Sequence, residues 1–373
     1  MNDSDYMQYA LQLAARGRHT ARPNPMVGAV VVQDGRIVGK GWHQQAGGPH
    51  AEVMALKEAG ACAKGATLYV TLEPCSHVGK TPPCADLVIR CGIRRVVCAM
   101  QDPFARVNGR GIARLREAGI TVDIGTEREA AEILNRGYLQ TVRKGRPYIV
   151  AKWAMTLDGK TATAGGESQW ITSEEARADA HRWRAAADAV AVGIGTILTD
   201  NPRLTVRYGD TSWQPLCAVW DTHARIPLNC TLLTERPNDT VVLLGEESSR
   251  EAAERIRRTG ATVISLPLSP DGHIDTEKAL QTLTSLCAVH ELFVEGGATL
   301  LGALSDGDYL DEITTYIAPK AFGGVEAKGA MAGQGIRHIT DAHQYVVADI
   351  RRCGPDVRIT YTRHRKEEPC LPD

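Results

Sequence analysis

The sequence predicts an α/β protein with two domains, on three observations. A length of 373 residues corresponds to about two domains of roughly 100–200 residues each. Short apolar, β-branched runs alternate with helical patterns along both halves of the chain, as in sheets that are covered by helices. The charged Gly/Pro segment KGRP at 144–147 separates the halves. We therefore expect a first domain at residues 1–145, a second at 146–366 and a polar tail at 367–373.

The first half alternates helices and strands. A helical pattern near residues 5–16 comes first, and the strand AVVVQDG then turns directly into the strand RIVGKGW. The remaining elements, in order, are a helix at 51–60, a strand at 67–72, a helix at 84–92, a strand at 94–100, a helix at 111–119, a strand at 120–125 and a helix at 128–143. Such βαβ alternation predicts a three-layer α/β domain.

The second half predicts another α/β layout, which ends in antiparallel strands. It begins with a strand at 147–162, the loop GGESQW and a helix from Ser173 to Ala187. The runs DAVAVGIGT, LCAVWDT, TVVLLGE and ATVISLP predict four further strands. The last expected elements are a helix at 276–289, a strand at 291–297, a helix at 298–307 and strands at 312–320 and 356–363.

Composition and charge disfavour several classes of protein. The apolar content of 43% and the charged content of 23% are ordinary for a globular protein. A formal net charge of -1 gives no general attraction to nucleic acid or to a membrane surface. No apolar run has the length of a membrane span, and the N-terminal segment is unlike a signal peptide. The ten cysteines are scattered along the chain, so we expect a reduced, cytoplasmic protein with two cysteines on a metal.

The segment from His50 to Cys84 contains the residue types of a catalytic zinc site. His50, Cys75 and Cys84 can supply three ligands and leave one tetrahedral position open for water. Glu52 is a nearby carboxylate that can carry protons to a ring nitrogen and to a departing amine. The combination of H-A-E, E-P-C and P-P-C predicts a zinc deaminase more strongly than any one of these residues alone.

Local structure supports this geometry. The residues after His50 form a helical pattern, so His50 and Glu52 fall in a first helical turn. Cys75 follows a strand and Cys84 opens the next helix, so two helix N-termini converge and favour thiolate over thiol. Alternatively, these are ordinary buried cysteines and His50 is a surface residue. Another alternative is a structural zinc protein that acts as an interaction module, in which His77 closes the site as a fourth ligand.

With both halves considered, the chain resembles the bifunctional deaminase–reductase of riboflavin biosynthesis over nearly its whole length. The segments that carry the resemblance are RPNPMVGAVVV, GWHQQAGGPHAEVMAL, YVTLEPCSHVGKTPPC, MQDPFARVNGRG, LDGKTATAGGESQWITS, TDNPRLTVR, VEGGATLLGAL and YIAPKAFG. The resemblance implies an N-terminal cytidine-deaminase-like three-layer α/β/α domain and a C-terminal dihydrofolate-reductase-like α/β domain. It also implies a homo-oligomer with Zn²⁺ and NADPH as cofactors.

The resemblance further implies two successive reactions on a small-molecule pyrimidine ribotide. The first is zinc-dependent hydrolytic deamination of 2,5-diamino-6-(5-phosphoribosylamino)pyrimidin-4(3H)-one, with Glu52 as the catalytic residue. The second is NADPH-dependent reduction of the ribosyl side chain, which gives 5-amino-6-(5-phosphoribitylamino)uracil. Asn24 and His43 match positions that line the deaminase pocket. On sequence alone they would be a turn residue and a solvated loop residue.

The spacing of the two cysteines agrees with this branch of deaminases. Eight residues separate Cys75 and Cys84, whereas nucleoside and tRNA-type deaminases place their cysteines about two residues apart. The longer insertion brings Lys80 next to the metal, where a cation would meet a substrate phosphate.

For the second reaction, a G-x-G-x-x-G fingerprint is neither expected nor found. Instead, Gly296 and Gly297 follow a strand and open a helix, where backbone N–H groups can approach an anion. Glycines there also serve a tight turn for purely conformational reasons. Thr222 stands where the family commonly has Ser, so the choice between NADP and NAD stays open at this residue. The positions that the resemblance assigns to the cofactor are Ala154, Trp170, Thr196, Asp200, Thr222, Gly297, Ala298, Thr299, Leu300, Leu301, Gly302 and Ala303.

The resemblance also assigns the substrate positions of the second reaction. Two arginines and a serine among them form a phosphate grip. Lys152 lies in an apolar strand, where its charge needs an anionic partner. We expect Lys152, Asp200 and Glu295 to form a polar floor that binds the ribose and assists proton transfer. The substrate positions are Ser168, Arg184, Leu204, Arg207 and Glu295.

Other functions fit parts of the same pattern. A deaminase of nucleic-acid bases with an attached second domain is disfavoured by the neutral charge and the lack of basic-aromatic clusters. A chain with one inactive half fits the same motifs. So does a deaminase of another pyrimidine whose reductase domain is inactive or differently specific.

Overall fold

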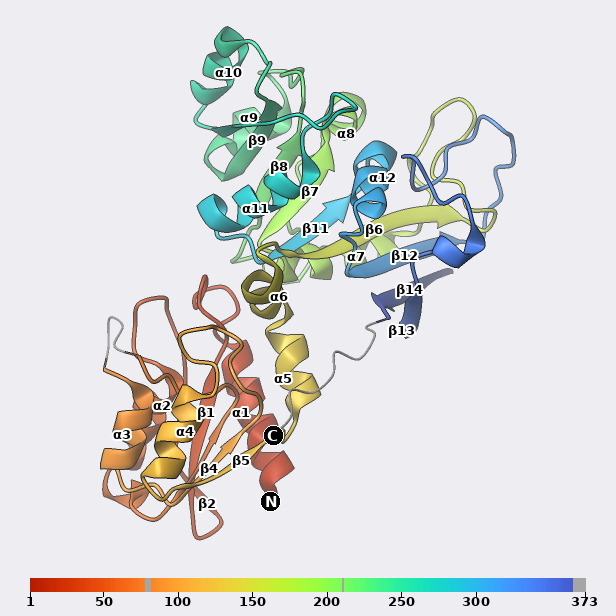
Figure 1. The fold of residues 1–373 in the computed structure, drawn as a ribbon. Helices are drawn as coiled ribbons and strands as arrows, with labels where there is room; N and C mark the ends of the chain where they lie inside the picture. The colour runs from red at the N-terminus through yellow and green to blue at the C-terminus, as the bar shows by residue number, and fades with distance from the viewer. Residues whose placement is uncertain (78–81, 210, 365–373) are drawn as a thin grey trace. The chain divides into compact units, whose positions relative to one another are not determined.

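The computed structural model describes residues 1–77, 82–209 and 211–364 (Figure 1). The chain divides into two compact units, Met1–Gly145 and Arg146–Asp373. The division falls inside the KGRP segment. The tail expected at 367–373 lies outside the described residues.

The first unit contains a five-stranded mixed sheet. Its strands, in spatial order, are β2 (Arg36–Trp42), β1 (Gly28–Gln33), β3 (Thr67–Val70), β4 (Arg95–Cys98) and β5 (Thr121–Ile124). β1 is antiparallel to both of its neighbours, whereas β3, β4 and β5 are parallel. The helical elements are α1 (Asp3–Ala15), α2 (Ala51–Ala59), η1 (Gly60–Ala63), α3 (Cys84–Arg90), α4 (Arg110–Glu117), α5 (Arg128–Leu134) and α6 (Arg136–Lys144).

Helices cover both faces of this sheet (Figure 1). Successive side chains of a strand point to opposite faces, and the core therefore has two layers. On β1, Val31 packs in the layer that contains α2, α3 and α4, whereas Val30 packs with α1, α5 and α6. The expected three-layer α/β/α domain is confirmed.

Glycines on β2 let α2 approach the sheet closely. A Cβ atom at Gly41 would lie 2.7 Å from the carbonyl oxygen of Ala51, and one at Gly39 would lie 2.1 Å from that of Ala55. Any side chain at these positions would therefore push α2 away from the strand. The close packing fixes the start of α2, where His50 is the N-cap residue.

The prediction of a single helix at 128–143 is wrong, because α5 and α6 are separate helices with Asn135 between them. Asn135 leaves helical geometry, with φ -107° and ψ 21°, and its side chain bonds a distant segment. Its Oδ1 accepts from the N–H of Met26 at 2.8 Å, and its Nδ2 donates to the carbonyl oxygen of Met26 at 2.9 Å. These bonds satisfy buried backbone groups just before β1.

The second unit contains a nine-stranded sheet. Neighbouring strands from β10 to β12 are parallel, and β14 and β13 complete the sheet antiparallel, as expected. The strands, in spatial order, are β10 (Thr262–Leu266), β9 (Thr240–Gly245), β8 (Leu216–Trp220), β7 (Ala189–Gly193), β11 (Glu291–Glu295), β6 (Tyr148–Thr156), β12 (Glu312–Ala318), β14 (Asp356–Arg363) and β13 (Tyr345–Cys353).

Helices pack on both faces of this sheet as well. Leu280 and Leu301 belong to the core on one face, and Ile197 and Leu232 to the core on the other. Within the described part of the chain, each helix is too short or too polar to cross a membrane. The helical elements are α7 (Glu174–Ala186), α8 (Ile194–Asp200), α9 (Thr231–Glu235), η2 (Pro237–Asp239), α10 (Arg250–Arg257), α11 (Thr276–Cys287), α12 (Ala298–Asp306) and η3 (Ile339–Asp341).

Several expectations for this half were wrong. The strand expected at 147–162 ends at Thr156, and the strand expected at 188–196 ends at Gly193, which is the N-cap of α8. The elements α8, α9, α10 and β13 were not predicted. α10 is rich in charged residues and buries little apolar surface, and β13 is a largely exposed edge strand. Neither carries the apolar periodicity from which buried elements are recognised.

Candidate active sites

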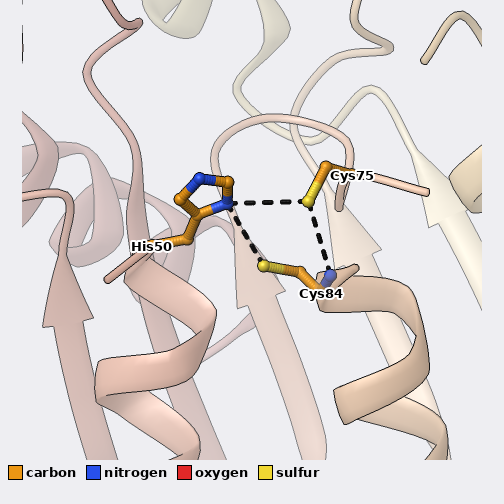
Figure 2. Close-up of side chains that lie close together, drawn as sticks. All are labelled: His50, Cys75 and Cys84. Carbon is orange, nitrogen blue, oxygen red and sulfur yellow. Dashed lines mark hydrogen bonds between the residues drawn. The ribbon is translucent and has the colours of Figure 1, made fainter. Parts of the chain in front are cut away.

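Figure 2 shows the first site, where His50, Cys75 and Cys84 meet. His50 is the N-cap of α2, Cys75 follows β3, and Cys84 is the first residue of α3. Nδ1 of His50 lies 3.6 Å from Sγ of Cys75 and 3.3 Å from Sγ of Cys84. The possible ligand atoms all lie within 4.8 Å of one another. The structure therefore brings the three predicted ligands to one point.

The chemistry of this set of donors suits zinc. One imidazole nitrogen and two thiolate sulfurs are ligands that Zn²⁺ prefers, and three protein ligands leave a fourth position open. The side-chain hydrogen bond between the two cysteines lowers the pKa of the Cys75 thiol and raises that of Cys84, so Cys75 is the one that more readily becomes a thiolate. His77 does not belong to the ligand group found among the described residues. Its ring lies edge-on to that of Phe104, with 6.3 Å between the ring centroids.

Glu52 is a buried carboxylate in the first turn of α2 and is only 3% exposed. Burial raises the pKa of its side chain from 4.5 to about 7, because a charged carboxylate is disfavoured away from water. A group whose pKa lies near the working pH can both accept and return a proton. The environment of Glu52 therefore suits a general acid–base.

Asn24 and His43 are hydrogen-bonded to each other beside His50. Nδ2 of Asn24 lies 2.9 Å from Nε2 of His43, and Nδ1 of His43 lies 3.1 Å from the carbonyl oxygen of Pro49. Because a carbonyl oxygen only accepts, Nδ1 of His43 carries the proton and Nε2 accepts from the amide. The rings of His43 and His50 are edge-on at 5.5 Å, and burial lowers the pKa of His43. Lys80, also predicted here, lies outside the described residues.

A carboxylate that was not predicted holds the loop beside this cluster. Glu73 lies two residues before Cys75 and is 4% exposed. Four hydrogen bonds from backbone N–H groups satisfy this buried carboxylate and fix the loop that leads into α4. The signal was present in the E-P-C and MQDPFARVNGRG motifs, to whose Glu and Gly residues no role was assigned. The carboxylate accepts hydrogen bonds from the backbone N–H groups of Asp102, Gly109, Gly111 and Ile112.

Gly111→Ala is expected to destabilise the first unit by about 1–3 kcal/mol. A Cβ atom at this position would lie 2.0 Å from the carbonyl oxygen of Pro74 and 3.2 Å from Oε1 of Glu73, so α4 or the E-P-C turn must move. The change is measured as a shift in the urea midpoint, with the loss of deaminase activity as the probe of unfolding. Gly329→Ala is the control, because a Cβ atom there would meet nothing within 4 Å. Equal midpoints for G111A and the wild type would contradict the close contact.

The second unit contains a cavity of about 440 Å³ beside β6, β11 and α8. The strands β8, β9 and β10 extend from one side of β7, whereas β11 and β6 lie on its other side. Such a change of direction is where open α/β sheets bind ligands. The predicted residues that line the cavity are Lys152, Ala154, Ser168, Trp170, Arg184, Thr196, Asp200, Leu204, Arg207 and Glu295.

Lys152 and Glu295 form an ion pair between neighbouring strands. They are partners in the β6–β11 register, and Nζ of Lys152 lies 3.6 Å from Oε2 of Glu295. The guanidinium group of Arg184 binds the same carboxylate through Nε and Nη2, the latter at 2.9 Å. Its Nη1 donates to the carbonyl oxygen of Thr205 at 2.8 Å. The anionic partner expected for Lys152 is therefore Glu295.

The phosphate grip and the polar floor differ from the expected arrangement. Arg184 is already engaged with a carboxylate, which leaves Arg207 and Ser168 as the predicted groups for a phosphate. Asp200 is exposed and accepts a hydrogen bond from Nε2 of Gln169 at 3.3 Å. The ion pair joins β6 and β11, whereas Asp200, on α8, bonds Gln169 and lines the same cavity.

The segment predicted to hold the dinucleotide begins at a tight glycine turn. Gly296 and Gly297 have φ values of 88° and 86°, and Gly297 is the N-cap of α12. A Cβ atom at Gly297 would lie in ordinary contact with the end of β7, 3.5 Å from the backbone nitrogen of Gly193, so the positive φ is what favours glycine here. The start of α12 presents backbone N–H groups that an anion can accept. Residues 298–303 lie along α12 and Thr222 follows β8.

Other cavity residues were not predicted. The guanidinium group of Arg177 lies 4.4 Å from the ring centroid of Trp170, which is 62% exposed. His181 precedes Arg184 by three residues on α7, so both lie on one face of the helix. That spacing was the signal available in the sequence. The additional lining residues are Gln169, Ile171, Thr172, Arg177, Ala180, His181, Pro202, Arg203 and Tyr208.

The second unit is expected to lose stability in acid through Glu295. Burial alone would raise the pKa of this carboxyl group, but Arg184 and Lys152 outweigh burial and lower it from 4.5 to about 2. The stabilisation is therefore fully present above about pH 4.5 and is lost as the pH falls towards 2. Urea unfolding across this range measures it. Glu295→Gln should be less stable at neutral pH, because Arg184 loses its partner, and should depend less on pH. Parallel curves would contradict the linkage.

Two family models match the chain. The model described as RibD C-terminal domain matches residues 147–359. The model described as cytidine and deoxycytidylate deaminase zinc-binding region matches residues 1–100. The expected pair of a cytidine-deaminase-like domain and a dihydrofolate-reductase-like domain is confirmed.

Similarity to known proteins extends over both units. Riboflavin biosynthesis protein RibD of Escherichia coli (strain K12) is 44% identical over 368 residues, which cover 96% of this chain and 98% of that protein. A solved structure of Acinetobacter baumannii RibD has a TM-score of 0.84 at 37% identity and covers 97% of this chain and 99% of that one. A Thermotoga maritima structure, named diaminohydroxyphosphoribosylaminopyrimidine deaminase/5-amino-6-(5-phosphoribosylamino)uracil reductase, has a TM-score of 0.81 at 32% identity, with coverage of 97% and 98%. Because the zinc-type cluster, the reductase fold and this full-length similarity coincide, the chain belongs to the RibD family of riboflavin biosynthesis proteins.

Proposed function

We propose that this chain catalyses two successive steps of riboflavin biosynthesis on one pyrimidine ribotide. The first unit deaminates 2,5-diamino-6-(5-phosphoribosylamino)pyrimidin-4(3H)-one. The second unit reduces the ribosyl side chain and gives 5-amino-6-(5-phosphoribitylamino)uracil. The observation that carries the proposal is the cluster of His50, Cys75 and Cys84 beside buried Glu52, in a chain whose other half matches the RibD C-terminal domain.

In the first reaction, Nδ1 of His50 and the sulfurs of Cys75 and Cys84 would hold Zn²⁺. Zinc supplies Lewis acidity, which lowers the pKa of water towards neutrality. Glu52 accepts a proton from the attacking water and returns it to the ring nitrogen, and it then carries the remaining proton of the added hydroxyl group to the leaving amine. Its pKa of about 7 suits both directions of transfer. His43, which is neutral and held by Pro49, orients the pyrimidine together with Asn24.

In the second reaction, NADPH would lie against the glycine turn and α12. The cofactor supplies a hydride equivalent for the ribosyl carbon. Lys152 and Glu295 hold the sugar, and the ammonium group of Lys152 supplies the proton that balances the reduction, while Arg207 and Ser168 bind the phosphate. Leu204 contributes to the substrate wall, and Arg184 keeps Glu295 ionised. The proposed cofactor contacts are Ala154, Trp170, Thr196, Asp200, Thr222 and the residues from Gly297 to Ala303.

The proposal includes the specific cofactors, Zn²⁺ and NADPH. It also includes a cytoplasmic location and a homo-oligomer, both of which stay predictions. The partner is the small-molecule ribotide, and no nucleic acid or membrane is expected as a partner.

Incubation with the diaminopyrimidinone ribotide is expected to raise the mass of the substrate by about one unit, as exchange of an amine for oxygen requires. A further rise of about two units should occur only when NADPH is present. Mass spectrometry of the products measures both steps. A first step without the second would leave a deaminase with an inactive or differently specific second unit. If the mass of the substrate changes neither with nor without NADPH, the proposed substrate is contradicted, and free pyrimidines and nucleosides would then be tested.

A further inference from the structure

His181 lies in the wall of the second unit's cavity, and neither proposed reaction uses it. It belongs to the buried face of α7 and is 3% exposed. The cavity brings it together with the Lys152–Glu295 ion pair and with Arg207. A buried imidazole at this place has access to both the sugar floor and the group expected to bind phosphate.

One nitrogen of the ring is already engaged. The backbone N–H of Arg207 donates to Nδ1 of His181 at 3.1 Å. A ring nitrogen that accepts a hydrogen bond carries no proton, so the neutral ring carries its proton on Nε2. The ring of Tyr208 lies edge-on to the imidazole, with centroids 5.0 Å apart. The hydrogen bond and the aromatic contact together hold the ring in one orientation and one tautomer.

The surroundings keep this ring neutral. Burial lowers the pKa of His181, and the cations Arg184 and Arg207 lower it further, to about 4. Lys152 acts in the same direction, whereas Glu295 opposes it. At neutral pH the ring can therefore donate one hydrogen bond through Nε2 without adding another positive charge to the cavity.

We propose that Nε2–H of His181 donates a hydrogen bond to an oxygen of the substrate's phosphoribosyl side chain during the second reaction. The inference rests on the proposed function and adds a substrate-binding residue to it. Its motivation is geometric, because Nδ1 is taken by the backbone of Arg207 and Nε2 is the remaining polar atom of a ring that lines the cavity. A donor of this kind holds the chain of the sugar between the ion pair and Arg207.

Two variants separate the two nitrogens of the ring. His181→Asn keeps an acceptor near the position of Nδ1 but lacks the distal donor. His181→Gln places an amide N–H near the position of Nε2 but lacks the proximal acceptor. We expect H181N to raise KM for the deaminated substrate roughly two- to tenfold with little change in kcat, the loss of one neutral hydrogen bond. H181Q should keep KM within about twofold of the wild type.

The controls distinguish binding from folding. His273→Asn makes the same exchange at an exposed histidine outside the cavity lining and should leave KM unchanged. Thermal melting and deamination, measured on each variant, report the state of the chain. If H181N fails to fold, His181→Ala takes its place as the variant without the donor, and the comparison with H181Q is made in the same way. A rise of about tenfold in H181Q overturns the proposed donor.

Three results would overturn the inference. Equal losses in H181N and H181Q would show a structural role, and a loss in H181Q alone would show that the contact with Arg207 is what matters. Unchanged KM in both variants would show that Nε2 makes no contact with the substrate. Each of these requires an active wild type. A wild-type chain that deaminates but reduces nothing would overturn the proposed function itself, and this inference with it.

Discussion

Glu52→Gln is expected to lower the rate of deamination by roughly 10²–10⁴-fold, the usual contribution of a general acid–base, while zinc stays bound. The variant keeps the size of the side chain and its place in the first turn of α2. It cannot accept a proton, and burial already tunes the natural carboxyl group to a pKa of about 7. The rate is measured by mass spectrometry of the products, and the metal content by elemental analysis.

Glu58→Gln is the matched control, because Glu58 is an exposed residue of the same helix. It should deaminate at the rate of the wild type. Both variants should reduce the deaminated intermediate normally when it is supplied directly. Near-normal deamination by E52Q would contradict the role of Glu52, and loss of zinc would show that the substitution disturbed the ligands instead.

Lys152→Ala is expected to lower the rate of reduction by roughly 10²–10³-fold, as removal of a preorganised polar group commonly does, and to leave deamination intact. Lys152 is the cation of β6 that faces Glu295 across the cavity floor. The carboxylate keeps its second partner, Arg184, in this variant, so the fold should survive. The rate is followed by consumption of NADPH with the deaminated intermediate as substrate.

Lys278→Ala removes an exposed lysine from α11 and serves as the control. It should reduce the intermediate as the wild type does. If K152A lost deamination and reduction equally, the two reactions would not occupy separate sites. If it reduced normally, the ion pair would be a structural feature of the sheet and not a part of the active site.

The zinc cluster could be predicted from sequence because its chemistry is encoded at short range. His50 is the N-cap of a recognisable helix, Cys75 follows a strand and Cys84 starts another helix. Together the H-A-E, E-P-C and P-P-C motifs contain the residue types that a catalytic zinc site needs. The buried parallel strands of both sheets were predicted for a similar reason, since such strands are continuous apolar runs, whereas the exposed edge strand β13 was missed.

The residues that the sequence did not reveal act through partners far along the chain. Glu73 bonds a loop about 30 residues further on, and Asn135 bonds Met26 across 109 residues. Arg184 meets Glu295 across 111 positions, a partner that its helical pattern did not indicate. The position of a polar side chain in a helical pattern does not identify the backbone group or charged side chain that it will bind in the folded protein. These partners are brought together only when the strands and helices have packed into the folded domain.

The bonds of Asn135 to Met26 also set where this chain can be cut. The zinc-binding region recognised by similarity stops at residue 100. A fragment that ended there would lose the loop that Glu73 binds, and it would also lose Asn135, whose side chain binds the backbone of Met26 just before β1. A breakpoint at Gly145, after α6, keeps both. We therefore expect Gly145 to be a suitable boundary for fusions, for split reporters and for versions of this chain that keep one activity.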